Sequence, residues 1–198
     1  MNVIDRSMAP FMLSRHIFFD STSFALFTLP HMAHPSVHKV IWRRSESVEA
    51  YDELVLQFKT EPLNIAHERL LDPKGQFIES QDADGKLVSL SLQYFSARLG
   101  TLRDEWRKRD QIEQIYDTIS DELTIWFFPP STIEWSFVPI YGSERFSTTS
   151  KDLGASPVDS IGALRVSNAS RNVSGVSNDV DAIQSGFNSL SLVDVRIE

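Results

Sequence analysis

The sequence predicts an α+β fold in which an antiparallel sheet of about five to seven short strands packs against helices. One short helix is expected at about 48–60, and a long or kinked helical region at about 91–127. Short aromatic and β-branched runs bounded by turn residues fill the first part of the chain, a pattern typical of strands. Apolar residues then recur three and four positions apart, which is the spacing of an amphipathic helix. This first stripe consists of Leu92, Phe95, Leu99, Leu102 and Trp106.

The N-terminal elements are expected to be strands. Residues 16–19 and 24–29 are short and rich in aromatic residues, and the polar segment 20–23 between them has turn chemistry, so we expect a β-hairpin. A third strand is expected at 37–43.

A short helix should follow, because one helical face would carry the apolar residues Val48, Tyr51, Leu54, Val55 and Phe58 before Pro62 ends it. Residues 72–75 place Asp, Pro and Gly where a type I turn prefers them, which favours strands at 64–71 and 76–79. A second turn at 82–85 then leads through 86–90 into the long helical region.

A second apolar stripe continues that region and lies about 120° around the helix from the first. It consists of Ile112, Ile115, Ile119, Leu123 and Trp126. One interpretation is a continuous helix whose first stripe covers its own sheet while the second contacts another subunit. The other is two ordinary or kinked helices, both buried in one domain. Gly100 weakens the helix and is compatible with either.

The helix should end at Pro129 and Pro130. In residues 133–141 apolar and polar residues alternate, as they do in a half-buried strand. Pro139 places the end of that strand at a sheet edge. Residues 1–142 are therefore expected to form a single α+β domain. Residues 143–198 are Ser-rich and poor in aromatics, which predicts a largely flexible polar tail with a strand-like end at 189–197.

Composition narrows the classes of function. The chain has no cysteine and a net charge of -8, so disulfides and thiolate chemistry are excluded and nucleic-acid binding is disfavoured. Its one basic cluster, 103–109, is mixed with acidic residues and reads as a solvated helix face. No apolar run reaches the roughly 20 residues of a membrane span, and no signal-peptide core of adequate length is present. We therefore expect an acidic, cytoplasmic protein in a reducing compartment.

No motif in the sequence specifies a reaction or a cofactor. His31, His34 and His38 lie close together, and neutral imidazoles in such a group can bind a divalent metal; the alternative is a solvated loop. Asp82 and Asp84 resemble the middle of a calcium loop, but the glutamate that completes such a loop is absent, so a turn is the better interpretation.

The sequence favours a non-enzymatic protein that binds other proteins or itself, with no cofactor and no nucleic-acid or membrane partner. The expected contact residues are Ile112, Ile115, Ile119, Leu123, Trp135 and Phe137. One alternative is a small-molecule-binding or metal-dependent enzyme that uses the His31, His34 and His38 loop, or His67 and Glu68. A further alternative is a structural protein of a particle whose tail becomes ordered on assembly.

Overall fold

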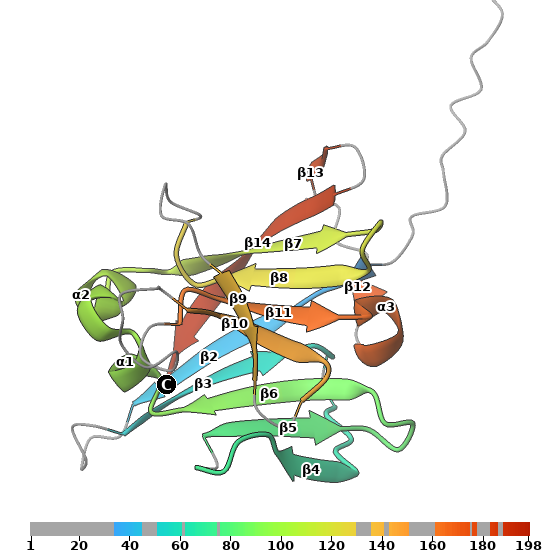
Figure 1. Cartoon of the computed structure of the whole chain (residues 1–198), viewed down its shortest axis with the longest axis horizontal. Helices are drawn as coiled ribbons and strands as arrows, with labels where there is room; N and C mark the ends of the chain where they lie inside the picture. The colour runs from blue at the N-terminus through green and yellow to red at the C-terminus, as the bar shows by residue number, and fades with distance from the viewer. Residues whose placement is uncertain are drawn as a thin grey trace, which may run out of the picture. The chain divides into compact units, whose positions relative to one another are not determined.

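Nearly all regular structure in the described part of the chain is β-strand (Figure 1). The computed structural model describes residues 34–44, 51–60, 62–74, 76–129, 136–140, 143–150, 161–174, 176–177, 183–185 and 188–198. Within these ranges the strands are β1 (His34–Pro35), β2 (Lys39–Arg44), β3 (Asp52–Gln57), β4 (His67–Leu70), β5 (Phe77–Gln81), β6 (Leu87–Gln93), β7 (Gln111–Asp117), β8 (Glu122–Trp126), β9 (Ser136–Pro139), β10 (Phe146–Ser150), β11 (Ala163–Ser167), β12 (Val176–Ser177), β13 (Ile183–Ser185) and β14 (Asn188–Ile197).

One curled sheet contains most of these strands. Its order is β4-β5-β6-β3-β2-β14-β7-β8-β11-β10-β9, and β13 pairs with β14 outside this path. Every neighbouring pair is antiparallel except β14 and β2, which are parallel. The C-terminal strand therefore joins the two halves of the sheet, and the sheet bends into a half-barrel around its core (Figure 1).

Period-two alternation builds the inner face of the half-barrel. In β7, Ile112, Gln114 and Tyr116 are buried, while the residues between them are partly exposed. In β8, Leu123 and Ile125 are buried in the same way. Because strand side chains alternate between faces, the apolar residues among them contribute to one core with residues from β2, β3 and β6, and the buried Gln114 amide pairs with the Val37 backbone.

An ion pair and hydrogen bonds connect the two ends of the curled sheet. The Arg145 guanidinium lies 3.1 Å from the carboxylate of Glu79, which is only 1% exposed. Close by, the Ser174 hydroxyl donates to Asp82 at 3.0 Å, and the Ser174 backbone N–H donates to the Leu87 carbonyl at 2.9 Å. The β5–β6 end of the sheet is thus tied to the segments that begin β10 and follow β11.

Short helices close one end of the half-barrel. They are α1 (Phe95–Arg98), the 3-10 helix η1 (Gly100–Leu102) and α2 (Arg103–Trp106). The buried Asp52 carboxylate accepts hydrogen bonds from the Ser96 backbone N–H and from the Trp42 indole. This carboxylate satisfies a free N–H at the start of α1 and anchors the helix to β2 and β3.

The α+β prediction is wrong, and its largest error is the long helical region at 91–127. The first stripe is helical only from Phe95 to Trp106, in three short pieces, and Gly100, the first residue of η1, has a positive φ of 53°. The second stripe is the hairpin of β7 and β8. Ile112 and Ile115 are three positions apart, which fits a helix, but they lie on opposite faces of a strand.

The predicted helix at 48–60 is also wrong within the described residues, because β3 occupies Asp52–Gln57. This strand is central and buried on both faces, so it lacks the polar alternation that identifies a half-exposed strand. The predictions of β4, β5 and the turn at 82–85 are confirmed, whereas β6 continues to Gln93, into the segment that was expected to be helical. β9 is the last strand in the sheet order, as Pro139 indicated. The predicted N-terminal hairpin lies outside the described residues.

The C-terminal part of the chain differs from the polar tail of the predicted fold. It contributes β10, β11, the short helix α3 (Ala169–Asn172) and the central strand β14. The strand-like pattern at 189–197 is thus a real strand, and its partners are β7 and β2 of its own sheet. Leu164 and Val166 are fully buried, so core residues occur even where the overall composition is polar.

Candidate functional site

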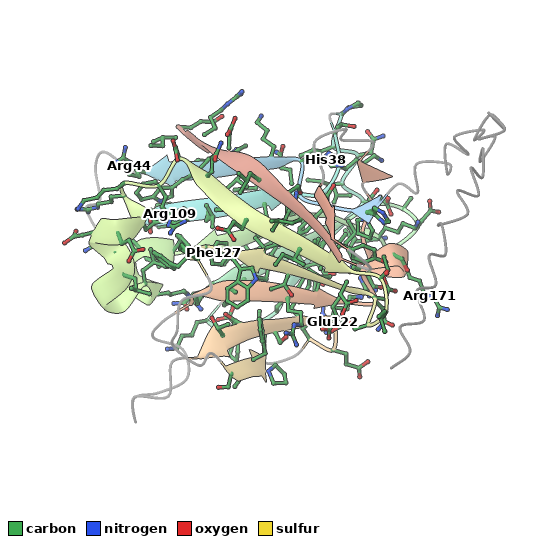
Figure 2. All side chains as sticks on the ribbon, turned by 90° about the horizontal axis from the view of Figure 1, so that it is seen from above. His38, Arg44, Arg109, Glu122, Phe127 and Arg171 are labelled. Atoms are coloured by element: carbon green, nitrogen blue, oxygen red, sulfur yellow. The ribbon has the colours of Figure 1, made fainter. Side chains whose placement is uncertain are left out.

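The outer face of the sheet over β14, β7, β8, β11 and β9 carries the candidate site. Strand register places its residues in rows across the sheet. One row runs from Leu192 through Glu113 and Trp126 to Ala163. The next runs from Leu190 through Ile115 and Thr124 to Arg165, Ser147 and Pro139. Figure 2 shows the same strands from above, with Glu122 labelled on this half of the sheet.

Large apolar side chains gather on these rows, and we call them the outer patch. Leu192 is 59% exposed, and the other members are partly exposed. The rings of Trp126 and Phe137 meet edge to face at 6.1 Å. The outer patch consists of Ile115, Trp126, Phe137, Leu190 and Leu192. A group of apolar residues that remains accessible on a folded surface is typical of a contact site.

Carboxylates border and interrupt the outer patch. Glu113 lies directly between Leu192 and Trp126, and Asp117 lies directly opposite Glu122. Asp194 of β14 accepts a hydrogen bond from the Gln111 side chain at 2.9 Å. Arg165 and Arg196 are the basic residues among the described strand positions of this face, against the carboxylates of Glu113, Asp117, Glu122 and Asp194, so the face is net negative.

A hollow of about 450 Å³ adjoins the outer patch at its β9 side. Its described lining residues are Glu122, Phe137, Pro139, Ser143, Glu144, Phe146, Ser147, Arg165 and Ser167. The volume lies within the range of small-molecule sites, which is roughly 300–1,000 Å³. The lining combines hydrogen-bond donors and acceptors with two aromatic rings.

Arg165 is held in place at this hollow. Its guanidinium carbon lies 3.7 Å from the centre of the Phe137 ring, and its Nε lies 3.4 Å from the Glu122 carboxylate. Stacking on a ring together with an ion pair fixes the plane of a guanidinium. Arg165 is therefore a positioned donor rather than a freely moving surface charge.

Asp121 organises the end of the sheet next to the outer patch. Its carboxylate accepts hydrogen bonds from the Tyr116 hydroxyl at 2.8 Å and from the Ser170 hydroxyl and backbone N–H at 2.7 and 2.8 Å. Burial by itself raises the pKa of Asp121, but the hydrogen bonds from Ser170 and Tyr116 outweigh it, so the pKa is lowered. Burial and the bond to Asp121 raise the pKa of Tyr116 to about 12.

The six predicted contact residues fall into four groups. Ile112 and Leu123 are core residues at 0% and 1% exposure, so they do not form a contact surface in the folded chain. Ile115 and Phe137 belong to the outer patch. Ile119 is 75% exposed in the turn between β7 and β8. Trp135 lies outside the described residues.

The predicted metal loop is only partly described. The His34 ring packs against the Tyr116 ring at a centroid distance of 5.4 Å, and the His38 backbone N–H donates to the Gln57 carbonyl. No group of three metal-ligating side chains converges in the part of the chain that the structure describes; His31 lies outside it. His67 and Glu68 are exposed neighbours on the edge strand β4, far along the sheet order from the hollow.

Sequence reasoning missed three members of the outer patch as contact residues. Trp126 was assigned to a helix stripe, while Leu190 and Leu192 were only recognised as part of a strand-like end. The signal that identifies them is period-two alternation on two neighbouring strands, which becomes visible once β14 is known to pair with β7.

No helix among the described residues has the length and apolar character needed to cross a membrane. A comparison of the chain with protein-family models found no match. Comparisons with curated proteins and with solved structures also found no match.

Proposed function

We propose that this chain is a protein-binding subunit that contacts another protein through the outer patch. The observation that carries the proposal is the exposure of Leu192, at 59%, in the same rows as Ile115 and Trp126. Interface centres are enriched in aromatic and aliphatic side chains that become fully desolvated on binding. The amphipathic helix originally expected to provide this contact is replaced by a sheet face.

The chemistry of the strands supports a contact role for this face. An antiparallel sheet with one face on its core ordinarily shows polar residues on the other face. Here β14 presents Leu190 and Leu192 on the outer side, while Val193 of the same strand is buried. Apolar residues at outward positions lower solubility unless a partner covers them.

Paired variants test the proposal, because the chain offers a matched control. Leu192→Asp places a charge at the centre of the outer patch, and Leu70→Asp places the same charge on β4, where Leu70 is 63% exposed. Both positions are exposed, so we expect both variants to fold, with Leu192→Asp melting slightly lower because its new carboxylate lies directly opposite Glu113. A protein partner should be retained by the wild type and by Leu70→Asp and lost by Leu192→Asp.

The proposal is contradicted if Leu192→Asp and Leu70→Asp retain the same protein partners. Self-association is checked by sedimentation of the wild-type chain. A dimer that dissociates in Leu192→Asp but persists in Leu70→Asp would identify the partner as a second copy.

The hollow supports a second candidate function, the binding of a small polar molecule. A fixed guanidinium with serine hydroxyls on neighbouring strand positions, as at Arg165, Ser147 and Ser167, offers several hydrogen bonds to one ligand. Screening the wild type and Arg165→Gln against a library of polar metabolites by thermal shift tests this function. A compound that stabilises only the wild type supports it, and the absence of any such compound opposes it.

A further inference from the structure

We infer that the partner which covers the outer patch presents apolar side chains together with lysine or arginine residues. This inference rests on the proposed function and adds the chemistry of the partner. Glu113, Asp117 and Glu122 lie on the same outward face of β7 and β8.

Glu113 is the first observation. The strand register places it between Leu192 of β14 and Trp126 of β8, so a carboxylate interrupts an otherwise apolar row. No ion pair or side-chain hydrogen bond of Glu113 occurs among the described residues, and the residue is partly exposed. An apolar partner surface alone would desolvate this carboxylate without compensation, which is costly. A cationic group on the partner would compensate it.

The pairing of Asp117 with Glu122 is the second observation. The two carboxylates lie directly opposite each other on β7 and β8, and like charges at directly opposite strand positions destabilise a sheet. Glu122 is partly compensated by Arg165 at 3.4 Å. Asp117 accepts hydrogen bonds from the Ile119 N–H and the Ser120 hydroxyl at the turn, but no cation faces it among the described residues. A partner cation at this place would relieve the repulsion.

The charge of the face also opposes two other occupants. The strand positions carry the carboxylates of Glu113, Asp117, Glu122 and Asp194 against the two guanidiniums of Arg165 and Arg196, so the face is net negative. A second copy of the same face would bring like charges together, and a phosphate backbone would be repelled. Complementary charge therefore favours a basic, apolar polypeptide.

Two synthetic peptides of equal length provide the probe. One alternates leucine with lysine and the other alternates leucine with glutamate, and each is titrated into the full chain by fluorescence anisotropy at low and at physiological salt. We expect the lysine peptide to bind at least about tenfold more tightly than the glutamate peptide, with weaker binding as salt increases.

Charge-reversal variants locate the effect on the protein. Glu113→Lys combined with Asp117→Lys should weaken binding of the lysine peptide about tenfold or more. The matched control, Glu68→Lys combined with Asp84→Lys, makes the same change in net charge at exposed positions of β4 and of the β5–β6 turn, and should bind like the wild type. An equal loss in both double variants, or equal binding of the two peptides, would overturn the inference.

Leu192→Asp separates this inference from the proposed function. If Leu192→Asp abolishes peptide binding while Glu113→Lys with Asp117→Lys leaves it unchanged, the outer patch binds a partner but the charge argument fails. If Leu192→Asp and Leu70→Asp bind the lysine peptide equally well, the outer patch is not the binding surface and both fail.

Discussion

Asp121 joins three segments of the molecule through one carboxylate. It adopts a left-handed conformation with φ 54° at the end of the β7–β8 turn, and its side chain receives hydrogen bonds from Tyr116 and Ser170. Asp and Asn tolerate this backbone region better than other residues that have a Cβ. The residue type thus meets both the backbone and the hydrogen-bond requirement of the turn.

Replacement of Asp121 should therefore separate these two requirements. We expect Asp121→Ala to lower the free energy of unfolding by about 2 kcal/mol, because it removes the acceptor and also disfavours the backbone conformation. Asp121→Asn keeps an acceptor oxygen and the tolerant backbone, so its loss should be smaller. Urea unfolding of the three proteins at neutral pH checks this, and equal losses in both variants would contradict it.

The lowered pKa of Asp121 also predicts a pH dependence. In the folded state the ionised carboxylate is favoured, so its contribution is complete above the ordinary pKa of an aspartate and disappears as the pH falls through the folded value. The stability difference between the wild type and Asp121→Asn should consequently shrink as the pH decreases below about 4. A difference that stays constant from neutral to acidic pH would exclude this role of the charge.

At the scale of the element, β7 shows why a helical spacing can occur in a strand. Ile112 and Ile115 belong to opposite faces, and only Ile112 is fully buried. A strand with one apolar residue on its exposed face yields the three-residue spacing of a helix by coincidence. Residues 117–121 indicate a turn at this place instead of a continuous helix, because the segment contains two Asp residues and a Ser, which are turn formers.

A pair of alanine substitutions in β7 distinguishes the strand from a helix. Ile112→Ala should reduce the free energy of unfolding by about 3 kcal/mol, because it leaves a cavity in the core. Ile115→Ala, three positions further on, should cost less than about 1 kcal/mol, because the side chain lies on the partly exposed face. Chemical denaturation measures both values. A helix with both residues on one buried stripe would instead give similar losses.

The sequence could predict those turns and strands that depend on residues only a few positions apart. The turns at 72–75 and 82–85 depend on Asp, Pro and Gly within a few positions, and β9 depends on its own alternation and on Pro139. It could not predict the arrangement of β3 or β14, because a central strand is defined by partners far along the chain: β14 pairs with β7 and β2, more than 70 residues away. The outer patch was only partly anticipated for the same reason, because Ile115 and Leu190 become neighbours through that pairing.

At the scale of the whole molecule, the half-barrel depends on a contact between its two ends. Glu79 on β5 and Arg145 before β10 form an ion pair in which the glutamate is 1% exposed and the arginine side chain 35%. Gln81 also donates to Glu79 at 2.8 Å. The Arg145 guanidinium additionally donates to the Gly85 carbonyl at 3.3 Å.

Removal of this arginine should loosen the half-barrel. We expect Arg145→Met to lower the free energy of unfolding by about 2–3 kcal/mol, since it leaves a buried carboxylate without its cation. The double variant Arg145→Met with Glu79→Gln should recover part of the loss. Arg43→Met, which removes exposed ion pairs with Glu53 and Glu198, is the control and should cost no more than about 1 kcal/mol. Equal losses in Arg145→Met and Arg43→Met would show that the contact does not close the sheet.

If the outer patch is the surface on which another polypeptide binds, site-specific photo-crosslinking in cells should detect that contact. A photoreactive residue is placed at position 192 in the patch or at position 70 on β4. We predict a crosslink to a second polypeptide from position 192, reduced in the Glu113→Lys and Asp117→Lys background, and none from position 70. Crosslinks of equal yield from both positions, or from position 70 alone, would contradict the account.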